Sequence, residues 1–367
     1  MHVLVTADTL GGVWTYTREL VTGLSQRGIK VTLLSFGEIP TAEQCEWLEG
    51  LRDVDFRATA FRLEWMQNSR DDLRASTEFL ETLVREVRPD LLHLSQYCYG
   101  ALNVDVPKIV VGHSDVVSWW MTVHGEAPPE NDWILEYRDA VMTGLIGADA
   151  VVAPSRWMLD QLREHYGALR QGMVIYNGRN PALFNPHTSK EDLVIAVGRA
   201  WDKAKQVSLL TEASHKIPVW VVGAEQHPDP AFRTHKVNRG RGVRYCGEQS
   251  ETQLRQLFGR AAIYAATSQY EPFGLAPVEA ALSRCAVIAN DTPTFRELWG
   301  ESACYFRRND PEDLARAIDE LRADRELRAT YANLAYRRAK QRFTADRMVN
   351  DYLNLYRTLR PAGVAVA

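Results

Sequence analysis

Two glutamates separated by seven residues lie in the segment YEPFGLAPVEAALSRCAVIAND, residues 270–291. Between Glu271 and Glu279 lie Gly274 and two prolines, and a helix-like apolar run follows. Pro277 reads as the first helical residue, which places Glu279 in the first turn of that helix. Gly274 allows the backbone to approach a ligand closely. Two carboxylates around such a backbone suit a molecule with several hydroxyl groups, although a surface ion pair is the alternative for either glutamate.

Basic residues follow a strand-like run in the segment AVGRAWDKAKQ, where Arg199, Lys203 and Lys205 are close in sequence. Cations in such a loop could neutralise a diphosphate, but a solvated basic loop has the same composition. His113 directly follows another strand-like run, VPKIVVG. A lone histidine is often structural, and its position after a strand favours a function.

Gly11 and Gly12 precede a helix-like segment that we expect over residues 13–28. Backbone N–H groups at a helix start can bind a phosphate or a sugar, and a plain tight turn is the alternative. The G-x-G-x-x-G fingerprint of dinucleotide-binding proteins is absent from the sequence. Asp53 and Asp55 have the spacing of a metal-binding D-x-D motif, but no other ligand set accompanies them, so we expect no metal site.

These residues require elements that place them at one edge of a sheet. Short apolar segments alternate with helix-like segments through the chain, which predicts parallel, doubly wound sheets. Ligands of such sheets bind beyond the carboxyl ends of the strands. We expect strands over residues 2–8, 29–37, 90–96, 106–112, 148–155, 172–178, 192–199, 217–224, 242–247, 261–268, 285–291 and 302–308.

The length of 367 residues exceeds what one hydrophobic core usually supports, so two Rossmann-like domains are expected. The segment 177–192 is rich in Asn, Pro and Gly and reads as a linker. We therefore expect an N-terminal domain over 1–180 and a C-terminal domain over 181–345. Residues 311–360 read as successive helices, with Asp310 as an N-cap, and a C-terminal helix over 346–367 is expected to return toward the first domain.

The charge balance and the cysteines limit which classes of protein and which cellular compartments are plausible. Lys and Arg total 43 and Asp and Glu total 47, a net charge of −4, which argues against a nucleic-acid partner. The five cysteines are scattered without a C-x-x-C pair, as in reduced cytoplasmic proteins. No apolar run approaches the roughly 20 residues of a membrane span. We expect a cytoplasmic protein, and peripheral contact with the inner membrane surface is compatible with these totals.

Taken together, the motifs resemble glycosyltransferase family 4, the glycosyl transferases group 1. Glu271 and Glu279 match its E-x7-E motif, and the resemblance covers roughly residues 1–358. The segments GGVWTYTRELVTGLSQRGIKV, VIYNG, VGRAWDKAK, YEPFGLAPVEA and FRELW occur in the order of the family. The resemblance implies an α/β GT-B fold of two Rossmann-like domains facing a central cleft. It also implies retaining transfer from a nucleotide-diphosphate sugar, UDP- or GDP-linked, without a metal or another cofactor.

The family resemblance also assigns roles to residues. Glu279 should hold the ribose hydroxyls and Glu271 the hydroxyls of the donor sugar. Arg199 and a lysine should bind the diphosphate, and His113 should lie near the reacting face of the sugar. The catalytic set is thus His113, Arg199, Lys205 and Glu271. Further donor contacts are expected from Gly11, Gly12, Asn177, the base-binding Tyr245, Cys246 and Gly247, and the backbone of Phe273, Gly274 and Leu275.

The choice of lysine follows from a departure from the family pattern. The common spacing would place the lysine at Ala204, whereas this sequence has Lys203 and Lys205. The segment resembles a subgroup with one extra residue, which favours Lys205. If the loop is extended, Lys203 points the other way.

Several functions stay open at this point. The sequence offers no obvious carboxylate nucleophile below the sugar ring, so front-face substitution is the expected mechanism. Alternatives are another GT-B enzyme, such as an epimerase or a phosphorylase, and a non-catalytic sugar-nucleotide-binding protein. A dehydrogenase is disfavoured by the missing glycine fingerprint. The acceptor is a carbohydrate, a lipid-linked molecule or a small molecule, and seven of the ten tryptophans lie in the first domain, where the family binds acceptors.

Overall fold

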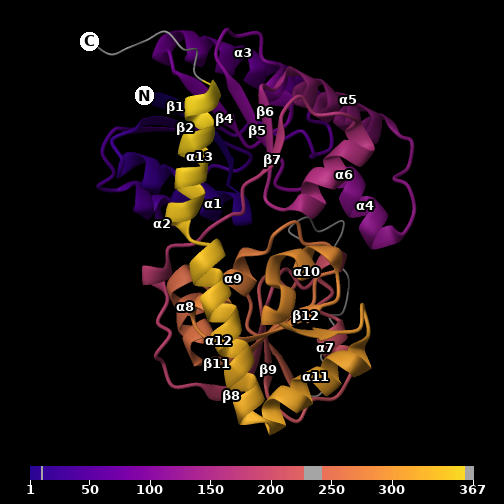
Figure 1. Cartoon of the computed structure of the whole chain (residues 1–367). Coiled ribbons are helices and arrows are strands. Elements are labelled where there is room, and N and C mark those ends of the chain that lie inside the picture. Colours follow the sequence, from indigo (N-terminus) through magenta and orange to yellow (C-terminus); the bar gives the residue numbers. More distant parts are fainter. Residues whose placement is uncertain (10, 227–241, 360–367) are drawn as a thin grey trace. The chain divides into compact units, whose positions relative to one another are not determined.

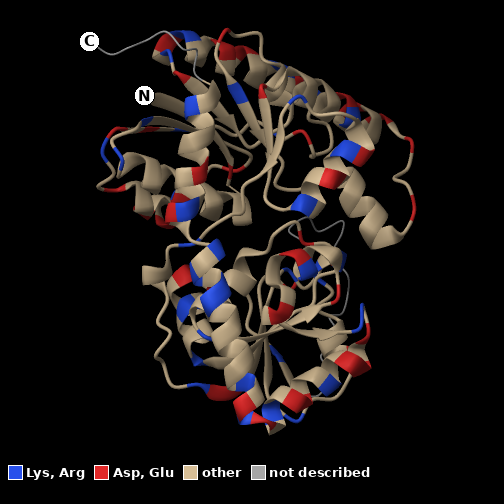
Figure 2. Cartoon of the chain, viewed as in Figure 1, with Lys and Arg blue, Asp and Glu red and all other residues tan. Residues whose placement is uncertain are grey.

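The computed structural model describes residues 1–9, 11–226 and 242–359. Two compact units make up the chain (Figure 1). Unit 1 comprises Met1–Gly178 together with Ala345–Ala367, and unit 2 comprises Arg179–Thr344. Lys and Arg are interspersed with Asp and Glu along the helices of both units (Figure 2).

Unit 1 contains a seven-stranded sheet in the order β3-β2-β1-β4-β5-β6-β7, in which every pair of neighbours is parallel. Its strands are β1 (His2–Asp8), β2 (Lys30–Phe36), β3 (Val54–Ala58), β4 (Leu91–Leu94), β5 (Lys108–Val111), β6 (Ala150–Ala153) and β7 (Gly172–Val174). Its α-helices are α1 (Gly12–Ser25), α2 (Ala42–Cys45), α3 (Arg70–Val87), α4 (Val116–His124), α5 (Asp132–Gly147), α6 (Arg156–Tyr166) and α13 (Ala345–Leu359).

Helices cover both faces of this sheet. Successive strand residues point to opposite sides, so the apolar strands present side chains on both faces that need to be covered. In β1, Leu4 packs into the core under α3, α5 and α6, whereas Val3 and Val5 pack into the core under α1 and α13. Helix α13 runs beside α1 in unit 1, although it follows unit 2 in the sequence (Figure 1). The expected C-terminal helix is present through Leu359, and residues 360–367, the end of that expected helix, lie outside the described residues.

Unit 2 contains a six-stranded parallel sheet in the order β10-β9-β8-β11-β12-β13. Its strands are β8 (Glu191–Val197), β9 (Val219–Val222), β10 (Val243–Tyr245), β11 (Ala261–Ala266), β12 (Ala286–Asn290) and β13 (Cys304–Phe306). Its α-helices are α7 (Leu209–Glu212), α8 (Glu251–Arg260), α9 (Leu275–Leu282), α10 (Pro293–Trp299), α11 (Pro311–Ala323) and α12 (Arg325–Arg342). The two parallel sheets with flanking helices confirm the expected α/β class with two Rossmann-like folds.

Three details differ from the sequence predictions. Strand β3 was missed, because it lies at the sheet edge and is only half-buried, so its polar residues hide the strand pattern. Helix α1 covers Gly12–Ser25 instead of 13–28. Helix α9 begins at Leu275, so Pro277 is its third residue and Glu279 lies beyond the first turn. Proline is tolerated there because the first N–H groups of a helix have no intrahelical acceptor.

Candidate active site

Lys205 and Glu271 form an ion pair beyond the carboxyl ends of the adjacent strands β8 and β11. The Lys205 Nζ lies 2.7 Å from the Glu271 Oε2. Ser268 Oγ donates a hydrogen bond of 2.9 Å to the same carboxylate oxygen. Both charged side chains are partly buried, at 23% and 16% exposure. Because β8 and β11 are hydrogen-bonded neighbours, the fold brings these two segments to one point at the sheet edge.

The backbone around Lys205 forms a 3-10 turn over Lys203–Lys205, so the loop is not extended and the rule of alternating side-chain directions does not apply to it. Asp202 caps this turn by accepting a 2.9 Å hydrogen bond from the N–H of Ala204. Thr267, after β11, donates its hydroxyl to the Lys205 carbonyl at 2.7 Å. The turn is therefore fixed to the loop that carries Glu271. Lys205 is partly buried, whereas Lys203 is exposed.

Arg199 follows β8 and lies mostly in solvent, with 54% of its side chain exposed. Its Nη2 is 2.8 Å from Oδ2 of the buried Asp202, and its guanidinium lies 4.9 Å from the centre of the Trp201 ring. A planar guanidinium held at its edge and on one face keeps N–H groups available for an anion. The segment thus offers two cations, Arg199 before the capped turn and Lys205 at its last residue.

Gly274 is the N-cap of α9 and has a φ of 83°, which favours glycine. A Cβ at this position would lie 3.1 Å from the Glu271 Cγ and crowd that side chain. Phe273 before it is buried against Phe343, with ring centres 5.4 Å apart. This packing fixes the turn that precedes α9, whose first residue is Leu275. The arrangement agrees with a backbone cradle beside Glu271.

Glu279 is buried and faces Arg179, a residue that sequence reasoning did not select. The Arg179 Nε lies 2.8 Å from the Glu279 Oε1, and its Nη2 lies 2.7 Å from the Glu251 Oε1. Arg179 is only 1% exposed. A buried guanidinium between two carboxylates holds the Glu279 side chain in one orientation. An arginine inside a polar linker-like segment gave no signal of this burial in the sequence.

The three residues expected at the nucleotide base lie at the end of β10. Tyr245 is the last residue of the strand, and the N–H of Cys246 donates to the Val221 carbonyl at 2.8 Å. The Gly247 carbonyl accepts a 2.9 Å hydrogen bond from the N–H of Gly223, which follows β9. These residues therefore lie at the same carboxyl edge of the unit 2 sheet as the Lys205 turn.

Gly11, Gly12, Asn177 and His113 all belong to unit 1. Gly11 is the N-cap of α1 and Gly12 its first residue, and both are exposed. Asn177 is buried, and within the described residues its Oδ1 accepts no hydrogen bond. The glycine turn thus leaves backbone N–H groups at a helix start, as the sequence predicted.

His113 follows β5 and rests on the ring of Tyr16. The two ring centres are 4.5 Å apart in an edge-to-face arrangement. The His113 Nε2 lies 3.3 Å from the Ser95 Oγ. Loss of hydration lowers the pKa of His113 to about 3. The imidazole is therefore neutral at neutral pH and can exchange a hydrogen bond with an uncharged group.

A second histidine, His93, lies beneath this pair and is fully buried. Its Nε2 is 2.8 Å from the Tyr16 hydroxyl, and its Nδ1 is 2.7 Å from the Tyr356 hydroxyl. Burial lowers the pKa of His93 to about 3, so it stays neutral. Because both ring nitrogens are bonded, the imidazole links α1 and α13 and fixes the ring on which His113 rests.

Two further features concern metals and membranes. Within the described ranges, no group of three or more His, Cys, Asp or Glu residues could hold a metal ion. Asp55, part of the D-x-D spacing, lies in β3 and pairs instead with Arg57 at 3.1 Å. Among the helices of the described residues, none combines the length and apolarity required to cross a membrane.

Family models match most of the chain in two adjoining stretches. The model described as Glycosyltransferase Family 4 matches residues 10–183. The model described as Glycosyl transferases group 1 matches residues 183–338. The first match falls in unit 1 and the second in unit 2, apart from a few residues at the border.

Sequence relatives and solved structures agree with these matches. Alpha-maltose-1-phosphate synthase of Mycolicibacterium smegmatis is 25% identical over 72% of this chain and 75% of its own length. O-antigen chain mannosyltransferase C of Escherichia coli is 22% identical over 98% of both chains.

Among solved structures, sucrose-phosphate synthase from Thermosynechococcus elongatus superposes with a TM-score of 0.78 at 19% identity, over 98% of this chain and 99% of its own. The Anabaena protein HepE in complex with UDP-glucose superposes with a TM-score of 0.75 at 17% identity, over 98% and 100%. The fold is thus GT-B. With both family models matched in sequence order, the chain belongs to the family 4, group 1 glycosyltransferases.

Proposed function

We propose that this protein transfers a sugar from a nucleotide-diphosphate sugar to an acceptor hydroxyl, with retention of the anomeric configuration and without a metal. The observation that carries this proposal is the Lys205–Glu271 pair beside Arg199 at the edge of the unit 2 sheet. Cations on a capped turn, paired with a hydroxyl acceptor from the neighbouring loop, match a ligand that joins a diphosphate to a sugar.

In this proposal, Arg199 and Lys205 stabilise the charge of the departing diphosphate. Fixed cations aimed at a charge that grows in the transition state lower the barrier without reorganising during the step. Glu271 accepts hydrogen bonds from the donor sugar, and Lys205 keeps that carboxylate in place. Glu279, oriented by Arg179, accepts from the ribose hydroxyls.

The reaction is proposed to proceed on the front face of the sugar. The bond between the anomeric carbon and the diphosphate oxygen breaks, and the acceptor oxygen forms its bond on the same face. The leaving phosphate oxygen takes the proton of the acceptor hydroxyl. In this proposal the neutral His113 exchanges a hydrogen bond with an uncharged sugar hydroxyl, because it is not an imidazolium that could act as a general acid at neutral pH.

The donor is proposed to be a UDP- or GDP-sugar. In the solved structures, HepE holds UDP-glucose, and the sequence relatives include mannosyltransferases. The acceptor class is a carbohydrate, a lipid-linked molecule or a small molecule. The free thiols of the five cysteines suit the cytoplasm, and peripheral contact with the inner membrane surface is part of the same proposal.

The experiment is incubation of the full chain with labelled UDP- and GDP-sugars, with and without acceptors and with excess EDTA. Transfer or slow donor hydrolysis that survives EDTA is the expected result, and product NMR should show the anomeric configuration of the donor. An epimerised nucleotide sugar would identify an epimerase instead. Binding of nucleotide sugars without any turnover would identify a non-catalytic protein. Activity lost with EDTA and restored by Mn²⁺ or Mg²⁺ would refute the metal-free mechanism.

A further inference from the structure

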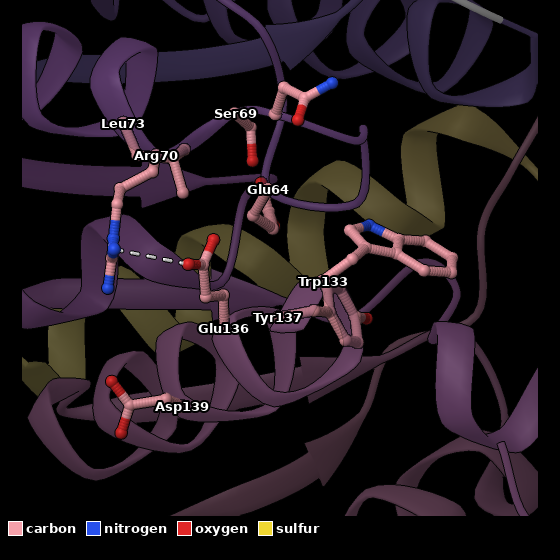
Figure 3. Close-up of a pocket in the computed structure, with 9 residues that line it drawn as sticks. Glu64, Ser69, Arg70, Leu73, Trp133, Glu136, Tyr137 and Asp139 are labelled. Carbon is pink, nitrogen blue, oxygen red and sulfur yellow. Dashed lines mark ion pairs between the residues drawn. The ribbon is translucent and has the colours of Figure 1, made fainter. Parts of the chain in front are cut away.

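A pocket in unit 1 encloses about 170 Å³ and contains a buried carboxyl group (Figure 3). We call it the Glu64 pocket, and its walls include Glu64, Ser69, Arg70, Trp133, Glu136 and Tyr137. The first three residues come from the loop after β3 and the start of α3, and the last three come from the first turns of α5. A cavity of roughly 150 Å³ is known to admit a six-membered ring, so this pocket is large enough for one.

The polar groups of the pocket favour a neutral ligand with hydroxyl groups. Glu64 is 5% exposed, and its Oε1 accepts a 2.8 Å hydrogen bond from the N–H of Tyr97. Its Oε2 faces the Cys98 thiol at 3.9 Å, which is a weak donor. Burial raises the pKa of Glu64 to about 7, so the carboxyl group can donate or accept at neutral pH.

The other charges of the pocket disfavour an anion. Arg70 lies 3.5 Å from Glu136, and this ion pair occupies one side of the pocket in Figure 3. Because Glu136 offsets Arg70 and Asp139 also lines the pocket, carboxyl groups outnumber the single arginine there. A phosphate would meet net negative charge, whereas hydroxyl groups would meet acceptors.

Aromatic rings supply the rest of the wall. The Trp133 Nε1 donates to the Trp65 carbonyl at 3.2 Å, which satisfies its polar edge. The Tyr137 hydroxyl donates to Asp115 at 3.0 Å and accepts from the N–H of Val116 at 3.1 Å. Since the polar atoms of both rings are already bonded, the rings act as flat apolar surfaces. Flat aromatic surfaces beside carboxyl groups suit a sugar ring, which has apolar C–H faces and hydroxyl edges.

The pocket is connected to the loop that carries His113. Tyr97, whose N–H binds Glu64, also donates its hydroxyl to the Ser114 carbonyl at 2.9 Å. Asp115, which binds Tyr137, caps α4 two residues after His113. Both connections lie within unit 1, so one hydrogen-bonded network shapes the pocket and positions this loop.

From these observations we infer that the Glu64 pocket binds a neutral pyranose or similar polyol ring of the acceptor. The acceptor role rests on the proposed transferase function, whereas the ring-binding role rests on the pocket alone. The structure of the walls predicts that a phosphate group on the ring weakens binding. Glu64 and Trp133 are the residues that set this specificity.

The test measures the binding of methyl α-D-mannopyranoside and methyl α-D-glucopyranoside to the full chain by saturation-transfer NMR and calorimetry. At least one glycoside should bind in the millimolar range, and mannose 6-phosphate and glucose 6-phosphate should bind more weakly. Trp133→Ala should weaken binding about fivefold or more, the loss that corresponds to an aromatic contact. Glu64→Gln, which keeps an acceptor for the N–H of Tyr97, should weaken it as well.

The matched control is Leu135→Ala, because Leu135 lies on the same helix, is 55% exposed and does not line the pocket. It should leave glycoside binding unchanged. With a donor that the protein uses, Trp133→Ala should raise the KM for the glycoside and change kcat less. Absence of binding by both glycosides, or equal binding by native protein and Trp133→Ala, would overturn the inference.

Nucleoside diphosphate binding is measured separately, so that the two proposals fail in different ways. Glycoside binding without nucleotide binding would retain the pocket and reject the transferase. Nucleotide turnover without an effect of Trp133→Ala on any glycoside would retain the transferase and reject the pocket.

Discussion

The ammonium group of Lys205 lies 2.7 Å from a carboxylate oxygen of Glu271, although the two residues are 66 positions apart in sequence. The pair exists because β8 and β11 are neighbours and because Thr267 holds the Lys205 carbonyl. The cation proposed for the diphosphate is thus linked to the carboxylate proposed for the sugar. Both ends of a sugar nucleotide would be recognised by one connected unit.

The first prediction concerns the two lysines of this turn. Lys205→Ala should reduce kcat/KM about a hundredfold, since a fixed cation in a catalytic cleft contributes roughly 3 kcal/mol. Arg199→Ala should have a comparable effect. Lys203→Ala is the matched control and should cost less than about tenfold, because Lys203 is exposed. The ranking is measured with one donor at fixed salt, and a larger loss for Lys203→Ala would contradict it.

The second prediction separates the two glutamates. Glu279→Gln should weaken the affinity for both the free nucleoside diphosphate and the intact donor, because Glu279 is assigned to the ribose. Glu271→Gln should preserve nucleoside diphosphate affinity and lower turnover, because Glu271 is assigned to the sugar. Calorimetry with the nucleoside diphosphate and steady-state kinetics give the two readouts. Equal losses of nucleotide affinity would disprove this division.

The third prediction concerns Arg179, which is buried between Glu279 and Glu251. Arg179→Met should lower the free energy of unfolding by about 3 kcal/mol, since it leaves Glu279 buried without its cation. Arg260→Met is the control, because it breaks an exposed pair with Glu191 and should cost less than about 1 kcal/mol. Urea denaturation measures both.

A double variant tests whether Arg179 acts through Glu279. The double variant combines Arg179→Met with Glu279→Gln. Its loss of unfolding free energy should be smaller than the sum of the losses in the two single variants, because the two side chains interact directly. Additive losses, or equal losses in Arg179→Met and Arg260→Met, would show that the buried pair has no special role.

The fourth prediction is a pH dependence of stability from Glu64. Burial raises its pKa from an ordinary value of 4.5 to about 7, so between these values the folded chain binds a proton that the unfolded chain has released. The contribution of Glu64 to stability therefore falls as pH rises from about 4.5 to 7 and stays low above that.

Glu64→Gln removes this titration. The free energy of unfolding of the variant should rise, relative to that of the native protein, by roughly 3 kcal/mol between pH 4.5 and 8. Denaturation of both proteins across this range provides the measurement. Glu126→Gln is a control, because Glu126 is exposed and does not line the pocket. A constant difference between Glu64→Gln and native protein at every pH would rule out the raised pKa.

The sheets were predictable because buried parallel strands are short apolar runs, and twelve such runs were identified. Strand β3 was not predicted, because an edge strand exposes about half of its residues and therefore lacks a continuous apolar run. The start of α9 was placed late because Pro277 is a strong but ambiguous signal of the first helical turn. Local sequence thus determines where most elements lie, and their ends depend on packing.

The candidate site was predictable where residues follow strands. Lys205, Glu271 and His113 were found in this way or from the family pattern. Arg179 was not, because its burial depends on carboxylates at Glu251 and Glu279, which are distant in sequence. The Glu64 pocket was also missed, since its walls come from two segments that only the folded unit brings together.

The two ends of unit 2 meet. The N–H of Arg179 donates to the Phe343 carbonyl at 2.9 Å, and Arg179 bridges Thr344 in parallel fashion. Unit 2 is therefore one continuous segment of the chain whose first and last residues lie next to each other. Removing the segment between these two points would take out the whole unit. The corresponding segment of a relative could be grafted between Gly178 and Ala345, which would exchange the unit proposed to bind the donor without rebuilding the unit proposed to bind the acceptor.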